Sequence, residues 1–256
     1  GLNDNFIKTL DLYNSEGKFN YFANLLSDNS NVSFKVAKYS SIDRVDLIEN
    51  NEYGYCSLIK ATKSVLAKLD IENKTAAKIT PMERIEMPMW NRIALREAVI
   101  NAIVHNDYSF EVPPKFEIFP DRLEITSAGR LPESMTKNEF YAGISMPRNK
   151  ELMRIYKDIE LVESLGSGIP RILQTYSEDC FHFTENFIRI ILPISQHFTQ
   201  TATQDGGNNG GLTVENIANK LGVSKRTIER DLSTLQKANI IRHSESRSKG
   251  FWELIQ

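Results

Sequence analysis

The segment LREAVINAIVHNDYS, residues 95–109, decides the fold of the larger part of this chain. From Ile93 to Val104 apolar side chains occupy nearly every side of a helix wheel, and a helix of that composition is buried inside a protein. We therefore predict a buried helix over residues 92–105. Two polar side chains interrupt it, Glu97 and Asn101, which lie four residues apart and so share one face of the helix.

A carboxylate and an amide inside a buried helix each need a partner, because an unpaired buried polar group is costly. One interpretation is structural, with Glu97 paired to Arg96 or to nearby backbone groups. The other is catalytic: the Asn101 oxygen holds a hydrated magnesium ion while Glu97 activates a water molecule. The residues alone leave both interpretations open.

The segments around this helix predict a mixture of helices and strands. Residues 34–39 alternate like a strand, residues 58–69 repeat apolar side chains at helical spacing, and KFEIFPDRLEIT at 115–126 predicts a β-hairpin around Pro120-Asp121. A Gly-rich turn and helix follow near 166–176, and a closing strand near 187–192. Such a mixture is typical of an α+β layer fold.

The C-terminal segment LGVSKRTIERDLSTL, residues 221–235, has the pattern of a helix-turn-helix. A short helix over 213–221 ends at the turn residue Gly222, and Ser224 is placed to cap a second helix that continues to about Lys237. On a helical wheel Ile228, Leu232 and Leu235 form the buried stripe. Arg226, Arg230, Ser233 and Lys237 fall on the opposite face, as a recognition helix entering the major groove requires.

Two further strands, near 240–242 and 251–254, flank a basic turn that we interpret as a wing. The whole segment resembles the winged helix-turn-helix of DeoR-type bacterial regulators, and its expected partner is double-stranded DNA. An alternative is an amphipathic helical hairpin for dimerisation, with solvated charges. Residues 212–256 contain eight Lys/Arg and five Asp/Glu, a charge of +3, which leaves −5 for the rest of a chain with total −2. The expected DNA contacts are Ser224, Lys225, Arg226, Thr227, Arg230, Ser233, Lys237, Arg247 and Lys249.

The amino-acid composition limits the class of protein to which the chain can belong. With 41% hydrophobic and 25% charged residues the chain has the makeup of a soluble globular protein, and no apolar run approaches the roughly 18 residues of a membrane span. We expect a cytoplasmic protein without a membrane partner. Cys56 and Cys180 belong to no metal-binding pair and are expected to be buried free thiols. The stretch QHFTQTATQDGGNNGG, residues 196–211, is expected to be a flexible linker.

Four blocks of the larger part resemble, in order, a divergent histidine-kinase-type (GHKL) ATPase domain. They are LREAVINAIVHNDYS, FEIFPDRLEITSAGRLP, SMPRNKELM and LVESLGSGIPRI, and the resemblance covers about residues 90–192. This domain occurs in bacterial transcriptional regulators, some called RecG-like, usually behind a Schlafen/AlbA-type DNA-binding domain. The resemblance implies an α/β sandwich over 90–195 followed by a small winged helix-turn-helix domain over 212–256. Residues 1–89 would be the connecting region, and an AlbA-type domain is expected before them.

The resemblance also implies a site for ATP and magnesium, with Glu97 as general base and Asn101 as the magnesium ligand. An Asp that binds the adenine amine is absent, because the matching turn reads Ser127-Ala128-Gly129-Arg130. Each further candidate has a structural alternative: a helix end for His105, a turn for Asp107, a helix-start ion pair for Arg148 and ordinary turns for the glycines. The expected cofactor-binding residues are Asn101, His105, Asp107, Gly129, Arg148, Gly166 and Gly168.

Two functions follow from these patterns. The first, which we favour, is a DNA-binding transcriptional regulator whose ATPase-like domain senses a ligand or mediates assembly, for instance of a homodimer. The alternative is an ATP-hydrolysing enzyme that couples turnover to a conformational change on DNA. A P-loop helicase is excluded, because the phosphate loop GxxxxGK[ST] occurs nowhere in the chain.

Overall fold

The computed structural model describes residues 10, 12–79, 81–162, 166–199, 224–237, 241–244 and 251–254. The chain divides into two compact units, which are described separately below. The first contains residues 1–75 and 88–195, and the second contains residues 76–87 and 196–256. In the described part of the chain, no helix combines the length and the apolarity needed to cross a membrane.

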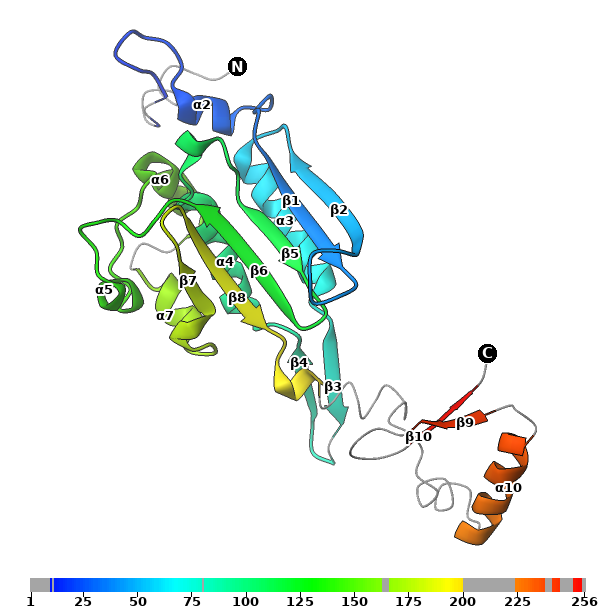
Figure 1. Cartoon of the computed structure of the whole chain (residues 1–256). Helices are drawn as coiled ribbons and strands as arrows, with labels where there is room; N and C mark the ends of the chain where they lie inside the picture. Colours follow the sequence, from blue (N-terminus) through cyan, green and yellow to red (C-terminus); the bar gives the residue numbers. More distant parts are fainter. Residues whose placement is uncertain are drawn as a thin grey trace. The chain divides into compact units, whose positions relative to one another are not determined.

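A six-stranded sheet in the order β2-β1-β5-β6-β8-β7 forms one layer of the first unit (Figure 1). The pairing of β1 with β5 is parallel, and every other neighbouring pair is antiparallel. The expected hairpin at 115–126 is confirmed as β5 and β6. The strands are β1 (Ser33–Tyr39), β2 (Leu47–Gly54), β5 (Lys115–Ile118), β6 (Arg122–Ala128), β7 (Phe181–Phe183) and β8 (Phe187–Pro193).

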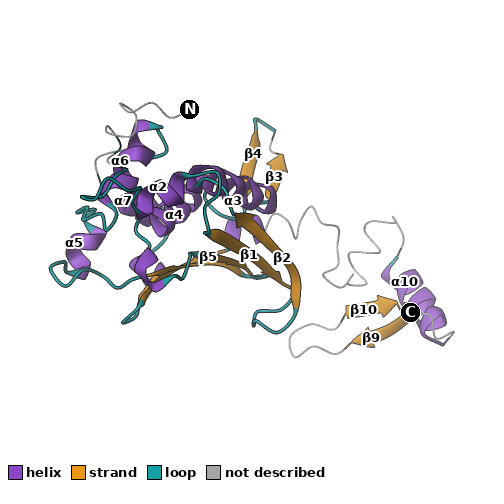
Figure 2. Cartoon of the chain, turned by 90° about the horizontal axis from the view of Figure 1, so that it is seen from above, coloured by secondary structure: helices purple, strands orange, loops and turns teal. Residues whose placement is uncertain are grey.

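Helices cover one face of this sheet, so the first unit is a two-layer α/β sandwich (Figure 2). The mixed α+β fold class expected from the sequence is confirmed. The longer helices are α3 (Leu58–Glu72), α4 (Arg92–Val104) and α6 (Lys150–Asp158), and the shorter ones are α2 (Tyr21–Leu26), α5 (Lys137–Tyr141), α7 (Gly168–Leu173), η1 (Tyr108–Phe110) and η2 (Glu178–Cys180).

Helix α4 lies at the centre of the core, as its all-round apolar sequence predicts. Val99 and Ile103 are fully buried, and Asn91 caps the helix by accepting hydrogen bonds from the N–H groups of Ile93 and Ala94. The β-strands present alternate apolar residues to the helical layer, among them Phe116 and Ile125. The core thus holds α4 in a fixed orientation, which in turn fixes where its polar side chains point.

Strands β1 and β2 belong to the same sheet as β5 to β8. They come from residues 1–89, the segment that the sequence suggests is a connecting region. Trp90 connects residues before position 90 with β8. Its indole Nε1–H donates to the Leu192 carbonyl on β8 at 3.0 Å, and its backbone N–H donates to Asn73 Oδ1 at 2.9 Å. The sandwich therefore extends well before residue 90.

The other face of the sheet carries a cluster of charged side chains. Glu117 and Glu124 face each other on β5 and β6, and both are almost fully buried. Arg44 binds both carboxylates, with its Nε 2.8 Å from Glu117 Oε1. This arginine relieves the repulsion that two like charges directly opposite each other on neighbouring strands would cause.

The second unit contains most of a hairpin formed by β3 (Thr75–Ile79) and β4 (Arg84–Pro88), the helix α10 (Lys225–Lys237), and the antiparallel pair β9 (Ile241–Ser244) and β10 (Phe251–Leu254). The expected second helix and the two strands of the wing are therefore present. The expected linker beyond residue 199, the helix over 213–221, Gly222, Arg247 and Lys249 lie outside the described residues.

Candidate functional site

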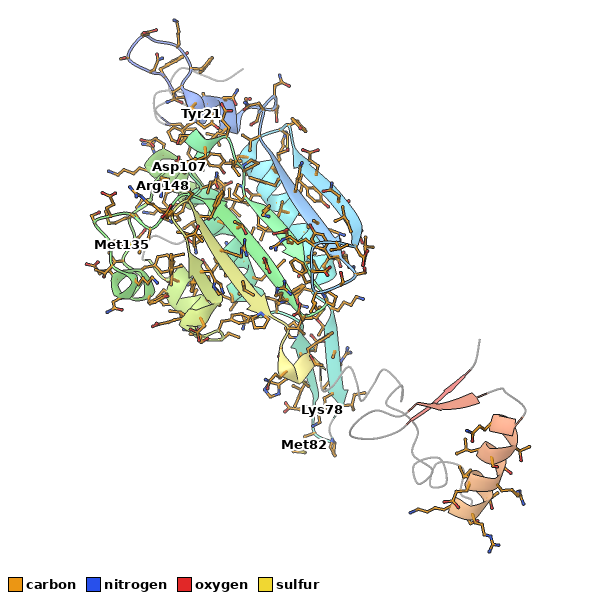
Figure 3. The ribbon with its side chains drawn as sticks, viewed as in Figure 1. Tyr21, Lys78, Met82, Asp107, Met135 and Arg148 are labelled. Atoms are coloured by element: carbon orange, nitrogen blue, oxygen red, sulfur yellow. The ribbon has the colours of Figure 1, made fainter. Side chains whose placement is uncertain are left out.

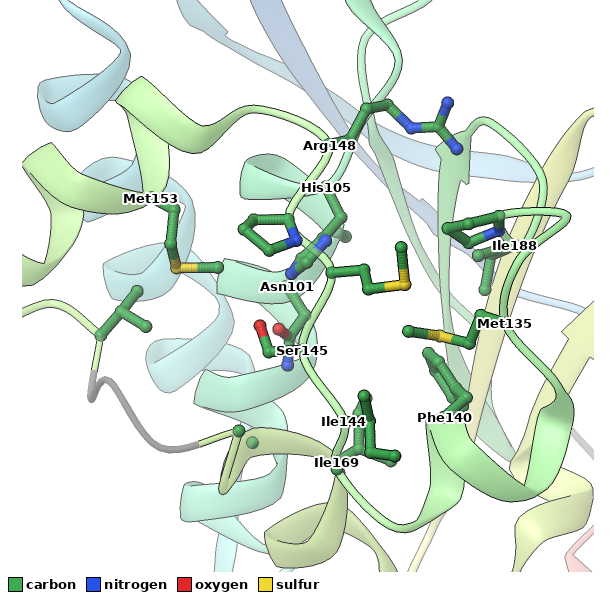
Figure 4. A pocket seen from close by; sticks show the side chains of 18 of the residues that line it. Asn101, His105, Met135, Phe140, Ile144, Ser145, Arg148, Met153, Ile169 and Ile188 are labelled. Carbon is green, nitrogen blue, oxygen red and sulfur yellow. The ribbon is translucent and has the colours of Figure 1, made fainter.

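A pocket of about 480 Å³ opens in the first unit beside α4 (Figure 4). The loop between β6 and α5, the loop before α6, and helices α6 and α7 complete its wall. One part of the lining is apolar, and another part is basic. The apolar residues include Met135, Phe140, Ile144, Met146, Met153, Ile169, Ile188 and Ile190, and the basic ones are Arg130, Arg148, Lys150, Arg154 and Lys157.

Three polar residues of α4 or its C-cap line this pocket: Glu97, Asn101 and His105. They are spaced by four residues, so they follow one another along a single face of the helix. The structure therefore places together three of the residues that the sequence singles out. Their proximity agrees with a ligand site, whereas their individual roles stay predictions.

Glu97 is held by two arginines rather than by one. Its Oε1 lies 2.9 Å from Nη1 of Arg171 on α7 and 3.5 Å from Nη1 of its neighbour Arg96. The Glu97 side chain is 10% exposed. Pairing with Arg96 is one of the alternatives drawn from the sequence, but the shorter contact, to Arg171, joins residues 74 positions apart and local patterns do not reveal it.

Asn101 presents a buried polar atom that lacks a partner. Its Nδ2 is the one buried side-chain nitrogen or oxygen in the described part of the chain without a hydrogen bond. The first residue of α7, Gly168, lies against it: a Cβ at that glycine would be 2.8 Å from Asn101 Nδ2 and 2.9 Å from Glu97 Oε2. Only glycine fits there without displacing one of the two side chains.

The predicted glycine Gly166 also has a packing role. Its φ is +65°, and a Cβ there would come within 1.9 Å of the Gly143 carbonyl oxygen. Gly143, at φ +81°, is packed in a similar way, because a Cβ there would lie 2.4 Å from the Gly166 carbonyl oxygen. The two backbones therefore touch, and this contact joins the loop before α7 to the end of α5. That the backbone amides near Gly166 bind phosphate stays a prediction.

Arg148 closes one end of the pocket. Its Nη1 donates to Asp107 Oδ2 at 2.9 Å and its Nη2 donates to the Arg130 carbonyl at 2.7 Å, and Figure 3 shows Asp107 and Arg148 side by side. The guanidinium covers Gly129, whose φ is +107° and where a Cβ would lie 2.9 Å from Nη2. Asp107 also accepts from the backbone N–H of Ser109, as expected of a turn residue. Asp107 is thus a support for Arg148 and does not line the pocket.

Burial, reinforced by the positive charge of Arg148, lowers the pKa of His105 to about 4. The imidazole is therefore neutral at neutral pH and can both donate and accept a hydrogen bond. Close by, two amides that the sequence does not single out fix the loop geometry. Asn106 Oδ1 accepts from the Ala128 N–H at 2.8 Å, and Asn149 Nδ2 donates to the carbonyls of Val104 and Asn106.

The carboxylate beside Asn101 fits magnesium poorly, whereas the binding of magnesium by Asn101 itself stays a prediction. Magnesium in nucleotide sites is usually held by one or two free carboxylates, by phosphates and by water. Glu97 is the only carboxylate among the lining residues, and it is already bound by two guanidinium groups that would repel a cation. No cluster of three or more His, Cys, Asp or Glu side chains suited to a metal ion occurs in the described residues.

The exposed face of α10 agrees with a recognition helix. Ile228 is buried and Leu232 half-buried, whereas Arg226, Arg230 and Ser233 are exposed. Ser224 caps the helix as predicted, because its Oγ accepts from the Thr227 N–H at 3.2 Å. The side chains of Leu235 and Lys237 lie outside the description.

Comparisons with known proteins agree with this architecture. Residues 112–189 match the family described as "Putative ATP-dependent DNA helicase recG C-terminal", and residues 207–250 match the family described as "HTH domain". The chain carries an ATPase-like domain and, after it, a helix-turn-helix domain. The helix-turn-helix match indicates DNA binding. No curated protein matches the chain.

A solved structure has a similar fold. The DIP2311 protein from Corynebacterium diphtheriae superposes with a TM-score of 0.63 at 16% sequence identity. The match covers 97% of this chain but 56% of that protein, so the chain spans little more than half the length of this relative. At this identity the likeness concerns the fold alone.

Proposed function

We propose that this protein is a DNA-binding transcriptional regulator whose ATPase-like domain binds a nucleotide as a signal. The proposal rests on the pocket, whose lining is partly apolar and partly basic. The same chain also has a helix-turn-helix domain. Apolar side chains such as Phe140, Ile144 and Ile169 suit a flat base, and basic side chains suit phosphates. The exposed arginines of α10 suit DNA.

The departures from the ATPase pattern favour sensing over turnover. At the turn where the related ATPases place an Asp for adenine, this chain has Ser127, which lines the pocket. Glu97, the expected general base, is engaged by Arg171. Both features weaken the case for an efficient ATPase while leaving a cavity in which a nucleotide fits.

The proposal is tested by measuring DNA affinity with and without nucleotide. The preferred duplex would be selected from random sequences with the full chain, and its affinity measured by fluorescence anisotropy in the absence and presence of saturating ATP or GTP. We expect a change in affinity of about fivefold or more, the usual size of an allosteric coupling. Identical DNA affinity under all conditions, together with no nucleotide binding, would contradict the sensing role.

A matched pair of variants locates the effect. Lys157→Glu reverses a charge on the pocket lining, whereas Lys63→Glu reverses an exposed charge on α3 away from the lining residues. The first variant should weaken the response of DNA affinity to nucleotide, and the second should leave it unchanged. Equal effects of both variants would show that the response depends on the overall charge of the protein and not on the pocket.

A further inference from the structure

The distribution of charge around the pocket is uneven. Five basic side chains line it, and Glu97 is the only acidic one among the lining residues. Three of the basic residues, Lys150, Arg154 and Lys157, follow one face of α6 at spacings of four and three residues. The pocket therefore offers positive charge from the protein itself along α6.

The single carboxylate of the lining is already paired with arginine. Oε1 of Glu97 accepts a hydrogen bond from Arg171 Nη1 at 2.9 Å, and Nη1 of Arg96 lies 3.5 Å from the same oxygen. Arg171 and Gly168 both belong to α7, and a Cβ at Gly168 would lie 2.9 Å from Oε2, so this helix packs closely against the carboxylate. A water molecule to be activated at Oε1 would have to displace Arg171, which a carboxylate binds strongly when both are partly desolvated.

A divalent cation usually neutralises the phosphates of a bound nucleotide. Here the same neutralisation is available from lysine and arginine side chains, whose N–H groups also donate hydrogen bonds to phosphate oxygens. A metal ion beside Glu97 would instead lie close to the guanidinium groups of Arg171 and Arg96. Electrostatics therefore favours protein cations over a metal ion in this pocket.

We propose that the pocket binds a nucleoside triphosphate without a divalent cation, and that Arg171 holds Glu97 as a structural anion so that the bound nucleotide is not hydrolysed. This inference rests on the proposed function, in which the pocket takes a nucleotide. It assigns Arg171 as a positioning residue, which acts by fixing α7 against α4. The nucleotide is then a signal that the protein binds and releases intact.

The test is a calorimetric titration of the full chain with ATP in two buffers, one with EDTA and one with magnesium chloride. We expect dissociation constants that agree within about threefold. Phosphate release, measured on the same samples, should not exceed that of ATP alone. A loss of affinity of about tenfold or more in EDTA would overturn the inference while leaving the nucleotide assignment intact. So would phosphate release that Glu97→Gln abolishes.

If the full chain binds ATP in neither buffer, the proposed nucleotide ligand is wrong, and this inference is wrong with it.

A second variant tests the role of Arg171. In Arg171→Ala the carboxylate is released, so ATP affinity should become dependent on magnesium. Arg92→Ala is the matched control, because Arg92 is an exposed arginine of α4 outside the pocket lining, and it should behave like the unchanged protein. If Arg171→Ala proves unfolded, the two titrations of the unchanged protein still decide.

Discussion

Arg171 Nη1 lies 2.9 Å from Glu97 Oε1, and this ion pair joins α7 to α4 across 74 positions of sequence. The two side chains are not equally buried, since the Arg171 side chain is 29% exposed and that of Glu97 is 10% exposed. The main energetic effect of the pair is therefore the cost of leaving a nearly buried carboxylate without Arg171 when the arginine is removed.

The first prediction concerns the stability of this pair. Arg171→Ala should lower the free energy of unfolding by about 2 kcal/mol, less than for a fully buried pair because water reaches the arginine. Glu97→Gln should cost less, because a neutral amide can remain buried beside an arginine that reaches solvent. Urea denaturation of both variants gives the comparison. Equal stability of Arg171→Ala and the unchanged protein would show that Glu97 does not depend on this partner.

The second prediction concerns the close approach of α7 to α4. Gly168→Ala places a Cβ within 2.9 Å of Glu97 Oε2 and Asn101 Nδ2, so it should lower the free energy of unfolding by roughly 1–3 kcal/mol through overpacking. Ser167→Ala, one residue earlier, serves as control and should change stability by less than about 0.5 kcal/mol. Thermal melts measure both. Tolerance of the alanine at 168 would mean that α7 does not press on the polar pair.

The third prediction follows from the low pKa of His105. The folded-state pKa of about 4 lies below the ordinary histidine pKa of 6.5, so the unfolded chain binds the proton more readily. The stability that His105 contributes is complete above pH 6.5 and is lost as the pH falls toward 4, by on the order of 2 kcal/mol after allowing for its partial exposure. His105→Gln should flatten the stability profile between pH 6.5 and 5, above the range where most carboxylates titrate. An unchanged slope in that window would assign the acid sensitivity to other groups.

The fourth prediction concerns the pair of Arg148 and Asp107. Asp107→Asn removes the charge that orients the guanidinium but keeps a side chain that can accept from the Ser109 N–H. We expect ATP affinity to fall by about threefold to tenfold with little change in melting temperature, because Arg148 loses its fixed position at the end of the pocket. A melting temperature that drops while affinity holds would make the ion pair purely structural.

The sequence predicted the elements whose patterns are local and strong. Helix α4 is recognisable because apolar residues surround it, and the β5–β6 hairpin because two alternating runs flank Pro120-Asp121. In α10 the wheel correctly assigned Ile228 to the buried side and Arg226 and Arg230 to the exposed side. These features depend on neighbouring residues only.

Other features arise from contacts that no local pattern encodes. Strand β2, LIENNEYG, is a polar strand at the edge of the sheet. Its sequence does not alternate between apolar and polar residues, so β-propensity does not identify it. Lys150, Arg154 and Lys157 are spaced along one helix face, but only the tertiary fold brings that face to the pocket. Arg171 could not be assigned to Glu97 for the same reason.

We propose that the helix-turn-helix domain binds DNA through the exposed face of α10. The most direct measurement compares the full chain with Arg226→Glu/Arg230→Glu in a duplex-DNA binding assay over a range of salt concentrations. We expect the double variant to lose about a hundredfold or more in affinity and to have a shallower salt dependence, while its melting temperature stays unchanged because both side chains are exposed. A variant that is folded and binds duplex DNA as tightly as the unchanged chain would contradict the account.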